Sequence, residues 1–395
     1  MRRANVAILI ALFASALPLR PQIIGVGPLI PAIQDDLDVS HAVAGLLPTI
    51  PVLCLGLFAP VTPYVLGRLG SRRSIALCLG LIGLFGVGRA LAPGIVAVVL
   101  LTFGVGLGMG ILGAVMPIAV KERFSHRPAF GTGVYSLGIN LGAAGAAAAA
   151  VPLANATWGW RGTFTVISAL TAFIVVVWLW LSRGEQPHTR TELRPPRLPW
   201  RSSIAWRMTG IFFLMSVVYY GMSAWLPDAF QERGWSESSA GALLSVAAFS
   251  ALPTTLVIPF LADRMWSRRT YFVVLFATTT LALVGFAAIP GAAWGWAVLV
   301  GLSIGGLFPM LMTLPLDVAD RPAEVGAVAG MMLGVGYTLS SLSPFVLGAI
   351  RDATGSYAAA LWVLVGASGV LLAASTQLTR ERLRRGVRRE SIAVD

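Results

Sequence analysis

Long apolar runs without a single charged residue constrain this chain more than any other feature. Residues 95–120, 162–182 and 208–227 are three such runs. A helix needs about 20 apolar residues to cross the hydrocarbon core of a bilayer, which is about 30 Å thick. Charged residues make up 12% of the chain, against about 25% in soluble domains. The sequence therefore excludes an ordinary soluble fold and predicts an all-α protein embedded in a lipid bilayer.

Apolar runs and turn residues together predict twelve transmembrane helices. The expected spans are residues 5–30, 42–66, 74–92, 95–120, 129–154, 162–182, 208–230, 240–262, 270–289, 293–316, 325–350 and 357–378. The joint between the sixth and seventh spans is rich in Pro and Arg, as linkers often are. We therefore expect four parts: an N-terminal six-helix half (1–182), a linker (183–207), a C-terminal six-helix half (208–378) and a basic tail (379–395).

The basic residues lie at alternate joints between the spans. Of the 29 Lys and Arg residues, all except Arg20, Arg89, Arg161, Arg233 and Arg351 fall on the side of the two termini and the linker. The positive-inside rule makes that side cytoplasmic. Topology thus accounts for the net charge of +12, and we expect no nucleic-acid partner.

The chain repeats itself at a spacing of 196 residues. Pro31 aligns with Pro227, and the Ser-Arg-Arg sequence at 71–73 aligns with that at 267–269. Two six-helix halves in the same orientation are the simplest explanation. Because the repeat includes the end of the first span, it favours a first span that is kept as a transmembrane helix of the mature protein. The alternative is a cleavable leader, with which the basic start and the small residues at 14–16 are compatible.

The joint between the second and third spans contains a repeated motif. It reads PYVLGRLGSRR in the first half and PFLADRMWSRR in the second. Both resemble the Gly-x-x-x-Asp-Arg-x-Gly-Arg-Arg signature of the major facilitator superfamily, whose transporters place substrate near the midplane between two halves. The resemblance implies a charge latch that stabilises the outward-facing state, formed here by Arg68, Asp263 and Arg264. Gly67 replaces the usual Asp in the first copy.

Four further segments are similar to one family within that superfamily. LRPQIIGVGPLIP, GLLPTIPVLCLGLFAP, VGRALAP and MPIAVKERF resemble the cyanate permease and 2-nitroimidazole transporter family. The likeness covers the first half and, more weakly, the second. It implies a small, planar, anionic or polar substrate, with no cofactor and no metal. With one Lys against 28 Arg residues, the chain is typical of a GC-rich bacterial genome, and we expect a monomer in the bacterial cytoplasmic (inner) membrane.

Arg20 stands between Pro18 and Pro21 in the middle of the first span. At 1.5 Å per residue it lies about 16 Å from one boundary and about 24 Å from the other, so its side chain reaches neither surface. No Asp or Glu stands at comparable depth in any span, and an unpaired buried charge is costly. A guanidinium matches carboxylates and similar oxyanions. We therefore expect Arg20 to bind an anionic substrate; the alternative is a structural Arg that caps carbonyls of a broken helix.

Four other residues are candidates for substrate contact. Arg89, near the outer end of the third span, is expected either to snorkel to the surface or to serve as a second clamp for an anion. Asn140, Tyr220 and Tyr337 fall near the middle of the fifth, seventh and eleventh spans. Aromatic walls with a few polar groups suit a small planar ligand, although each residue has a packing role as its alternative.

Direction and coupling do not follow from the sequence. Uniport, exchange and symport stay open, and Asp228, at the outer end of the seventh span, is the candidate if a protein group carries a proton.

The leading hypothesis is a transporter of a small, planar anion that works by alternating access, and three alternatives stay open. One is a proton-coupled exporter of small drugs or nitroaromatic compounds, although the fourth span lacks the early Arg of such exporters and the fifth lacks their Gly-Pro pair. A solute sensor is another. A membrane enzyme is disfavoured because the spans contain no paired carboxylates, and because His41, His126 and His188 lie in joints or the linker.

Overall fold

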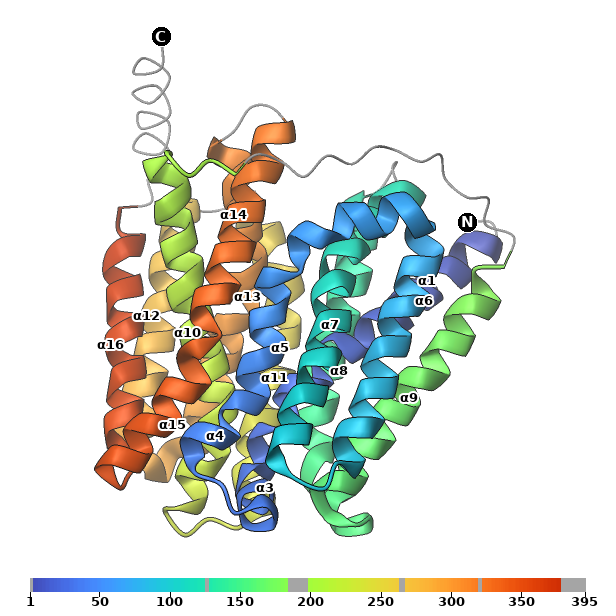
Figure 1. Ribbon diagram of the computed structural model, residues 1–395. Helices are drawn as coiled ribbons and strands as arrows, with labels where there is room; N and C mark the ends of the chain where they lie inside the picture. The colour runs from blue at the N-terminus through green and yellow to red at the C-terminus, as the bar shows by residue number, and fades with distance from the viewer. Residues whose placement is uncertain (1–2, 125–127, 184–197, 263–266, 319–321, 378–395) are drawn as a thin grey trace.

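The described part of the chain, residues 3–124, 128–183, 198–262, 267–318 and 322–377 of a computed structural model, is entirely helical (Figure 1). The first half contains α1 (Arg3–Ala16), η1 (Leu17–Leu19), α2 (Pro21–Ile24), η2 (Gly27–Leu29), α3 (Ile30–Leu37), α4 (His41–Ala44), α5 (Leu46–Leu57), η3 (Ala59–Val61), α6 (Thr62–Leu91), α7 (Ile95–Arg123), α8 (Pro128–Ala156) and α9 (Gly159–Leu181). The second contains α10 (Ser203–Gln231), α11 (Glu237–Ala262), α12 (Arg268–Ala288), η4 (Pro290–Ala292), α13 (Ala293–Val318), α14 (Pro322–Ser340), α15 (Leu342–Thr354) and α16 (Ala358–Ser375).

Eleven helical stretches of the described chain are long and apolar enough to cross a membrane. One of them, His41–Leu91, is 51 residues long, which as a single helix would measure about 75 Å. The chain turns within this stretch at Gly70, whose φ of 70° and ψ of 167° are not helical. Glycine adopts this backbone conformation without a steric penalty. The turn at Gly70 divides the stretch in two, which fits the twelve crossings predicted from the sequence.

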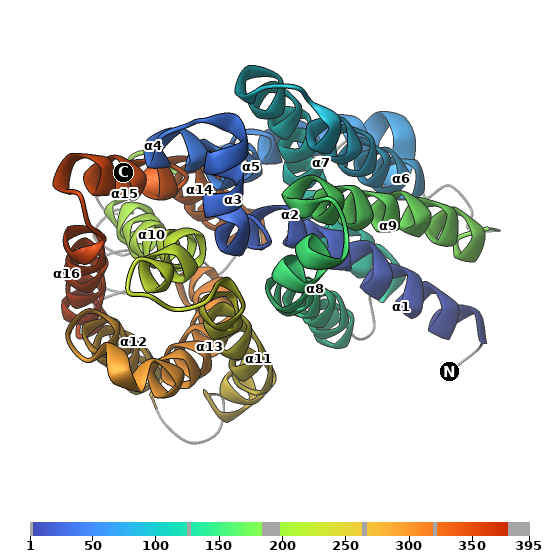
Figure 2. The ribbon, with the colours of Figure 1, turned by 90° about the horizontal axis from the view of Figure 1, so that it is seen from below.

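The helices form two groups that lie side by side. Figure 2 shows α6–α9 with α1 in one group and α10–α16 in the other, with α3, α4 and α5 along the border between them. The start of α1 and the end of α16 are on the same side of the molecule, at the top of Figure 1. Following the orientation predicted from the basic residues, we call this side the inner face and the opposite side the outer face.

Proline breaks the first membrane-crossing segment into short pieces. Pro18, Pro21, Pro28 and Pro31 each stand at the start of a new element, namely η1, α2, η2 and α3. A proline has no backbone N–H and interrupts the hydrogen bonding of a continuous helix. The helix is therefore broken on both sides of Arg20, which lies at the junction of η1 and α2 with a non-helical φ of −123°.

The two halves meet closely near the outer face. A Cβ atom added at Gly27 would stand 2.2 Å from the Ser223 carbonyl oxygen, and one at Gly348 would stand 2.5 Å from the His41 carbonyl oxygen. Helix α4 also packs against α15, and α5 packs against α14. Small residues of this kind allow membrane helices to approach closely. The outer face is therefore closed by backbone-to-backbone packing between the halves.

Candidate substrate site and outer gate

Arg20 lies against aromatic rings of the opposite half. Its guanidinium carbon is 5.0 Å from the ring centre of Tyr219, 5.6 Å from that of Tyr220 and 6.0 Å from that of Phe308. Such cation–π contacts contribute about 0.5–2 kcal/mol but leave the positive charge in place. Within the described residues, no carboxylate forms an ion pair with Arg20. The charge therefore stands at the border of the two halves without an anionic partner.

The rings around Arg20 form a connected cluster. Tyr220 contacts Tyr219 and Tyr337 edge-on, at 5.1 Å and 6.2 Å between ring centres, and Tyr337 contacts Phe212 at 4.9 Å. Tyr220 is only 2% exposed, and its hydroxyl has no hydrogen-bond partner among the described residues. A buried polar group without a partner is costly. Two of the candidate residues, Tyr220 and Tyr337, thus lie in the same aromatic cluster beside Arg20.

Asn140 takes part in a contact between the halves. Its Nδ2 donates to the Thr255 hydroxyl at 3.4 Å, which joins α8 to α11. The single Thr255 hydroxyl hydrogen is in turn within reach of two carbonyl oxygens, of Ala251 at 2.8 Å and of Gly305 at 3.1 Å from the hydroxyl oxygen. The structure therefore places Asn140 at the border of the halves, where its side chain is hydrogen-bonded to Thr255 of the second half.

Arg89 is buried inside the first half. It is 1% exposed, so the expectation that it snorkels to the surface is wrong. Its Nη2 donates to Gln22 Oε1 at 2.6 Å, Gln22 Nε2 donates to the Ser168 hydroxyl at 3.0 Å, and its guanidinium carbon is 4.2 Å from the ring centre of Phe164. Nε and Nη1 of Arg89 have no partner among the described residues. Arg89 therefore anchors the segment that follows Arg20, because Gln22 belongs to α2.

The residues expected to form the inner latch are only partly described. Asp263 and Arg264 lie outside the described residues. Arg68 is exposed, and its guanidinium carbon is 4.3 Å from the ring centre of Tyr64. The interhelical contacts come instead from Arg72, which donates to the Ser182 hydroxyl at 2.9 Å and to the Leu179 carbonyl at 3.0 Å.

The repeat contains an equivalent of Arg72 in the second half. Arg268, 196 residues further on, lies within 3.5 Å of both the carbonyl and the hydroxyl oxygen of Thr313. The shared Ser-Arg-Arg sequence was therefore the signal that could have identified these two residues.

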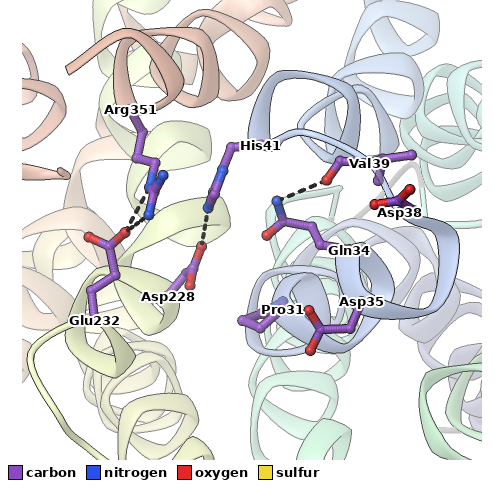
Figure 3. Close-up of a pocket in the computed structure, with 9 residues that line it drawn as sticks. All are labelled: Pro31, Gln34, Asp35, Asp38, Val39, His41, Asp228, Glu232 and Arg351. Carbon is purple, nitrogen blue, oxygen red and sulfur yellow. Dashed lines mark hydrogen bonds and ion pairs between the residues drawn. The ribbon is translucent and has the colours of Figure 1, made fainter. Parts of the chain in front are cut away.

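A pocket of about 500 Å³ opens between the halves at the outer face (Figure 3). It is lined by Pro31, Gln34, Asp35, Asp38, Val39, His41, Asp228, Glu232 and Arg351. Arg351 pairs with Glu232 through its Nε at 2.7 Å. His41 points toward Asp228 across the border, with 3.7 Å between Nε2 and Oδ2.

Sequence reasoning found Asp228 but missed the partners of this carboxylate. Asp228 is 5% exposed and accepts a hydrogen bond from the Tyr357 hydroxyl. His41 also contacts Asp352, with 2.7 Å between Nδ1 and Oδ1. These groups come from segments more than a hundred residues apart, so that nothing in their spacing brings them together. We call His41, Asp228, Asp352 and Tyr357 the outer gate.

Comparisons with known proteins agree with this architecture. Residues 6–344 match the family described as the Major Facilitator Superfamily. The 2-nitroimidazole transporter of Escherichia coli (strain K12) is 28% identical over 359 residues, which cover 90% of this chain and 91% of that protein. The cyanate transport protein CynX of the same organism is 30% identical over 358 residues, which cover 88% of this chain and 91% of that protein. The crystal structure of the nucleoside transporter NupG matches the fold with a TM-score of 0.75 at 13% identity, over 94% of this chain and 99% of that one.

The helical halves and these relatives define a membrane transporter of a small solute, and not an enzyme. The chain belongs to the Major Facilitator Superfamily. It is a multi-pass protein of the bacterial inner membrane, and the resemblance to the cyanate and 2-nitroimidazole transporters is confirmed.

Proposed function

We propose that this protein carries a small, planar, anionic solute across the membrane by alternating access, with Arg20 as the anion-binding residue. The proposal rests on the surroundings of Arg20. Its guanidinium is charged at every physiological pH, lies among rings of the opposite half, and forms no ion pair within the described residues. A bound anion would supply the missing counter-charge, and the unpartnered Tyr220 hydroxyl would supply a hydrogen bond.

The division of this site between the halves supports alternating access. Arg20 belongs to the first half, whereas Tyr220, Tyr337 and Phe308 belong to the second. A movement of one half relative to the other therefore changes the site directly. Because both walls come from one chain, we propose that the monomer is the functional unit. Asn140, and Arg89 acting through Gln22, complete the proposed set of substrate-site residues.

Two conformational elements belong to the same proposal. Asp228 is the proposed proton carrier if transport is coupled to protons, because it is buried at the outer side of α10. Arg68, Asp263 and Arg264 are the proposed inner latch, as their motif implies.

A second candidate function is proton-coupled export of small nitroaromatic compounds. The rings around Arg20 favour it, because a flat aromatic ligand stacks on aromatic side chains. The relative named as a 2-nitroimidazole transporter also supports it. In this alternative Arg20 contacts the ligand without a full anionic charge on it.

Thermal unfolding of the purified protein separates the two candidates. We expect cyanate and nitrate to raise the melting temperature of the wild type and of a control, Arg201→Ala, which removes an exposed arginine. Arg20→Ala should abolish this rise. Anion stabilisation that persists unchanged in Arg20→Ala contradicts the proposal. Stabilisation of the wild type by neutral 2-nitroimidazole and by neither anion favours the exporter.

A further inference from the structure

The outer gate contains a titratable residue that the anion site does not use. His41 begins α4 in the first half, and its partners Asp228, Asp352 and Tyr357 all belong to the second. Its side chain is 18% exposed and lines the outer pocket, so that water reaches it from the outside. The contacts of His41 therefore exist only while the halves are together at this face.

Both nitrogens of the His41 ring face carboxylate oxygens. Nδ1 is 2.7 Å from Asp352 Oδ1, and Nε2 is 3.7 Å from Asp228 Oδ2. Asp352 also accepts hydrogen bonds from the backbone N–H groups of His41 at 3.2 Å and Ala42 at 2.9 Å. Asp352 thus caps the start of α4 from the opposite half, and it fixes the imidazole between the two carboxylates.

This geometry suits an imidazolium better than a neutral imidazole. A neutral ring has one N–H and one lone pair, whereas the protonated ring donates from both nitrogens. In the neutral form a lone pair would face a carboxylate oxygen, which is repulsive. In the closed gate an imidazolium would thus have a carboxylate beside each of its two N–H groups, and separation of the halves removes both partners.

The other charged groups around His41 do not replace it in this role. Glu232 and Arg351 pair with each other. Tyr357 donates its hydroxyl hydrogen to Asp228. Asp35 and Asp38, from α3 and its end, line the same pocket and add negative potential that attracts a proton.

We propose that His41 is the proton-binding residue of the outer gate and that its protonation holds the outer face closed. The inference rests on the alternating access proposed above, and it extends the proton site from Asp228 alone to the pair of carboxylates that face His41. Acidification should stabilise the outer-closed conformation. For one proton, the ratio of closed to open molecules changes by at most about tenfold per pH unit.

Distance measurements between spin labels on the outer face test this proposal without substrate. Labels at Trp158→Cys and Ile289→Cys stand at exposed sites of opposite halves, 61% and 56% exposed, with Cys54 and Cys78 replaced by Ser. In the wild-type background we expect the short-distance population to grow as the pH falls from about 8.5 to about 5.5. His41→Gln, which cannot take up the proton, should show the open distance throughout and no pH response.

Three further variants keep the test decisive. Asp352→Asn should shift the closing transition to lower pH, because one carboxylate partner is lost, and it covers the case in which His41→Gln does not fold. Asp38→Asn, and a double change of His126 and His188 to Gln, should retain the response. A pH response that survives in His41→Gln overturns the proposal, and its loss in Asp38→Asn would assign it to Asp38.

Anion binding distinguishes this inference from the proposed function. His41→Gln should retain the anion-induced rise in melting temperature, since Arg20 is unchanged. Suppose that no anion stabilises the wild type, but that the label distances depend on pH in the wild type and not in His41→Gln. The anion proposal is then wrong, and the proposed role of His41 in closing the outer face is supported.

Discussion

Two buried arginines in the same half differ in what surrounds them. Arg89 donates a hydrogen bond to the Gln22 side chain and lies over the ring of Phe164. Protein groups therefore satisfy part of the hydrogen-bonding and charge requirement of its guanidinium. Arg20 lies over aromatic rings and forms no ion pair among the described residues. At the residue scale, this contrast separates an anchoring arginine from one that is ready for a ligand.

Replacing Arg20 by lysine should weaken anion binding even though the charge is kept. Lysine cannot present the two parallel N–H groups of a guanidinium, and one hydrogen bond to a charged group contributes about 1.5–3 kcal/mol. We expect the affinity of Arg20→Lys for cyanate to fall by about tenfold or more in a calorimetric titration. Equal affinities of the two proteins would show that the anion does not use the two parallel N–H groups of the Arg20 guanidinium.

Gln22→Leu should destabilise the first half more than Ser168→Ala does. The first change removes the acceptor of Arg89 and leaves its guanidinium without any described hydrogen bond, whereas the second removes one neutral bond. We expect losses of about 2–3 kcal/mol and about 1 kcal/mol in the free energy of unfolding. Unfolding of the two variants in a denaturing detergent measures the difference, and an equal loss would contradict the anchoring role of Arg89.

At the scale of elements, the repeat predicts contacts better than the superfamily signature does. Arg72 and Arg268 occupy equivalent places, and each reaches a neighbouring helix of its own half. Arg68, which belongs to the signature, is exposed and lies on Tyr64. The second arginine of each motif thus ties helices together within a half.

Arg72→Ala should lower the thermal stability more than Arg73→Ala. Arg72 bonds α9 through two oxygens, while Arg73 is exposed. The expected loss for Arg72→Ala is about 1.5–3 kcal/mol, and that for Arg73→Ala is within about 0.5 kcal/mol. Melting curves of the two proteins in detergent provide the comparison; similar curves would mean that these bonds contribute little.

Sequence reasoning predicted the features that depend on local chemistry. The long apolar helices follow from residue types, and the two prolines beside Arg20 mark where the first span breaks. It missed the groups that surround His41 and the contact of Arg89 with Gln22. Those depend on which distant segments meet, and one sequence contains no direct signal for such meetings.

At the scale of the whole molecule, closure of the outer face unites the two halves. Helices α8 and α11 meet across the border, where a Cβ atom added at Gly241 would stand 3.3 Å from the Val151 side chain. A cysteine sulfur in the place of that Val151 methyl group would lie close to the side chain of a cysteine at position 241, as a disulfide requires. A disulfide between α8 and α11 could therefore hold the two halves together at this border.

A Val151→Cys/Gly241→Cys pair, in a background without Cys54 and Cys78, should form a disulfide under oxidation and hold the outer face closed. We expect uptake or exchange by vesicles containing this protein to fall close to background and to recover after reduction. Each single cysteine variant is the control, since it cannot cross-link. Undiminished transport by a fully cross-linked protein would contradict alternating access at this border.

The unpaired charge of Arg20 has an electrical consequence. One elementary charge that crosses a potential of 100 mV changes energy by about 2.3 kcal/mol. If Arg20 binds a monovalent anion as proposed, the loaded carrier is neutral at this site, whereas the empty carrier presents a positive charge to the field when its access changes. We therefore expect exchange of one anion for another to be electrically silent, while net transport through the empty carrier produces a current and responds to voltage.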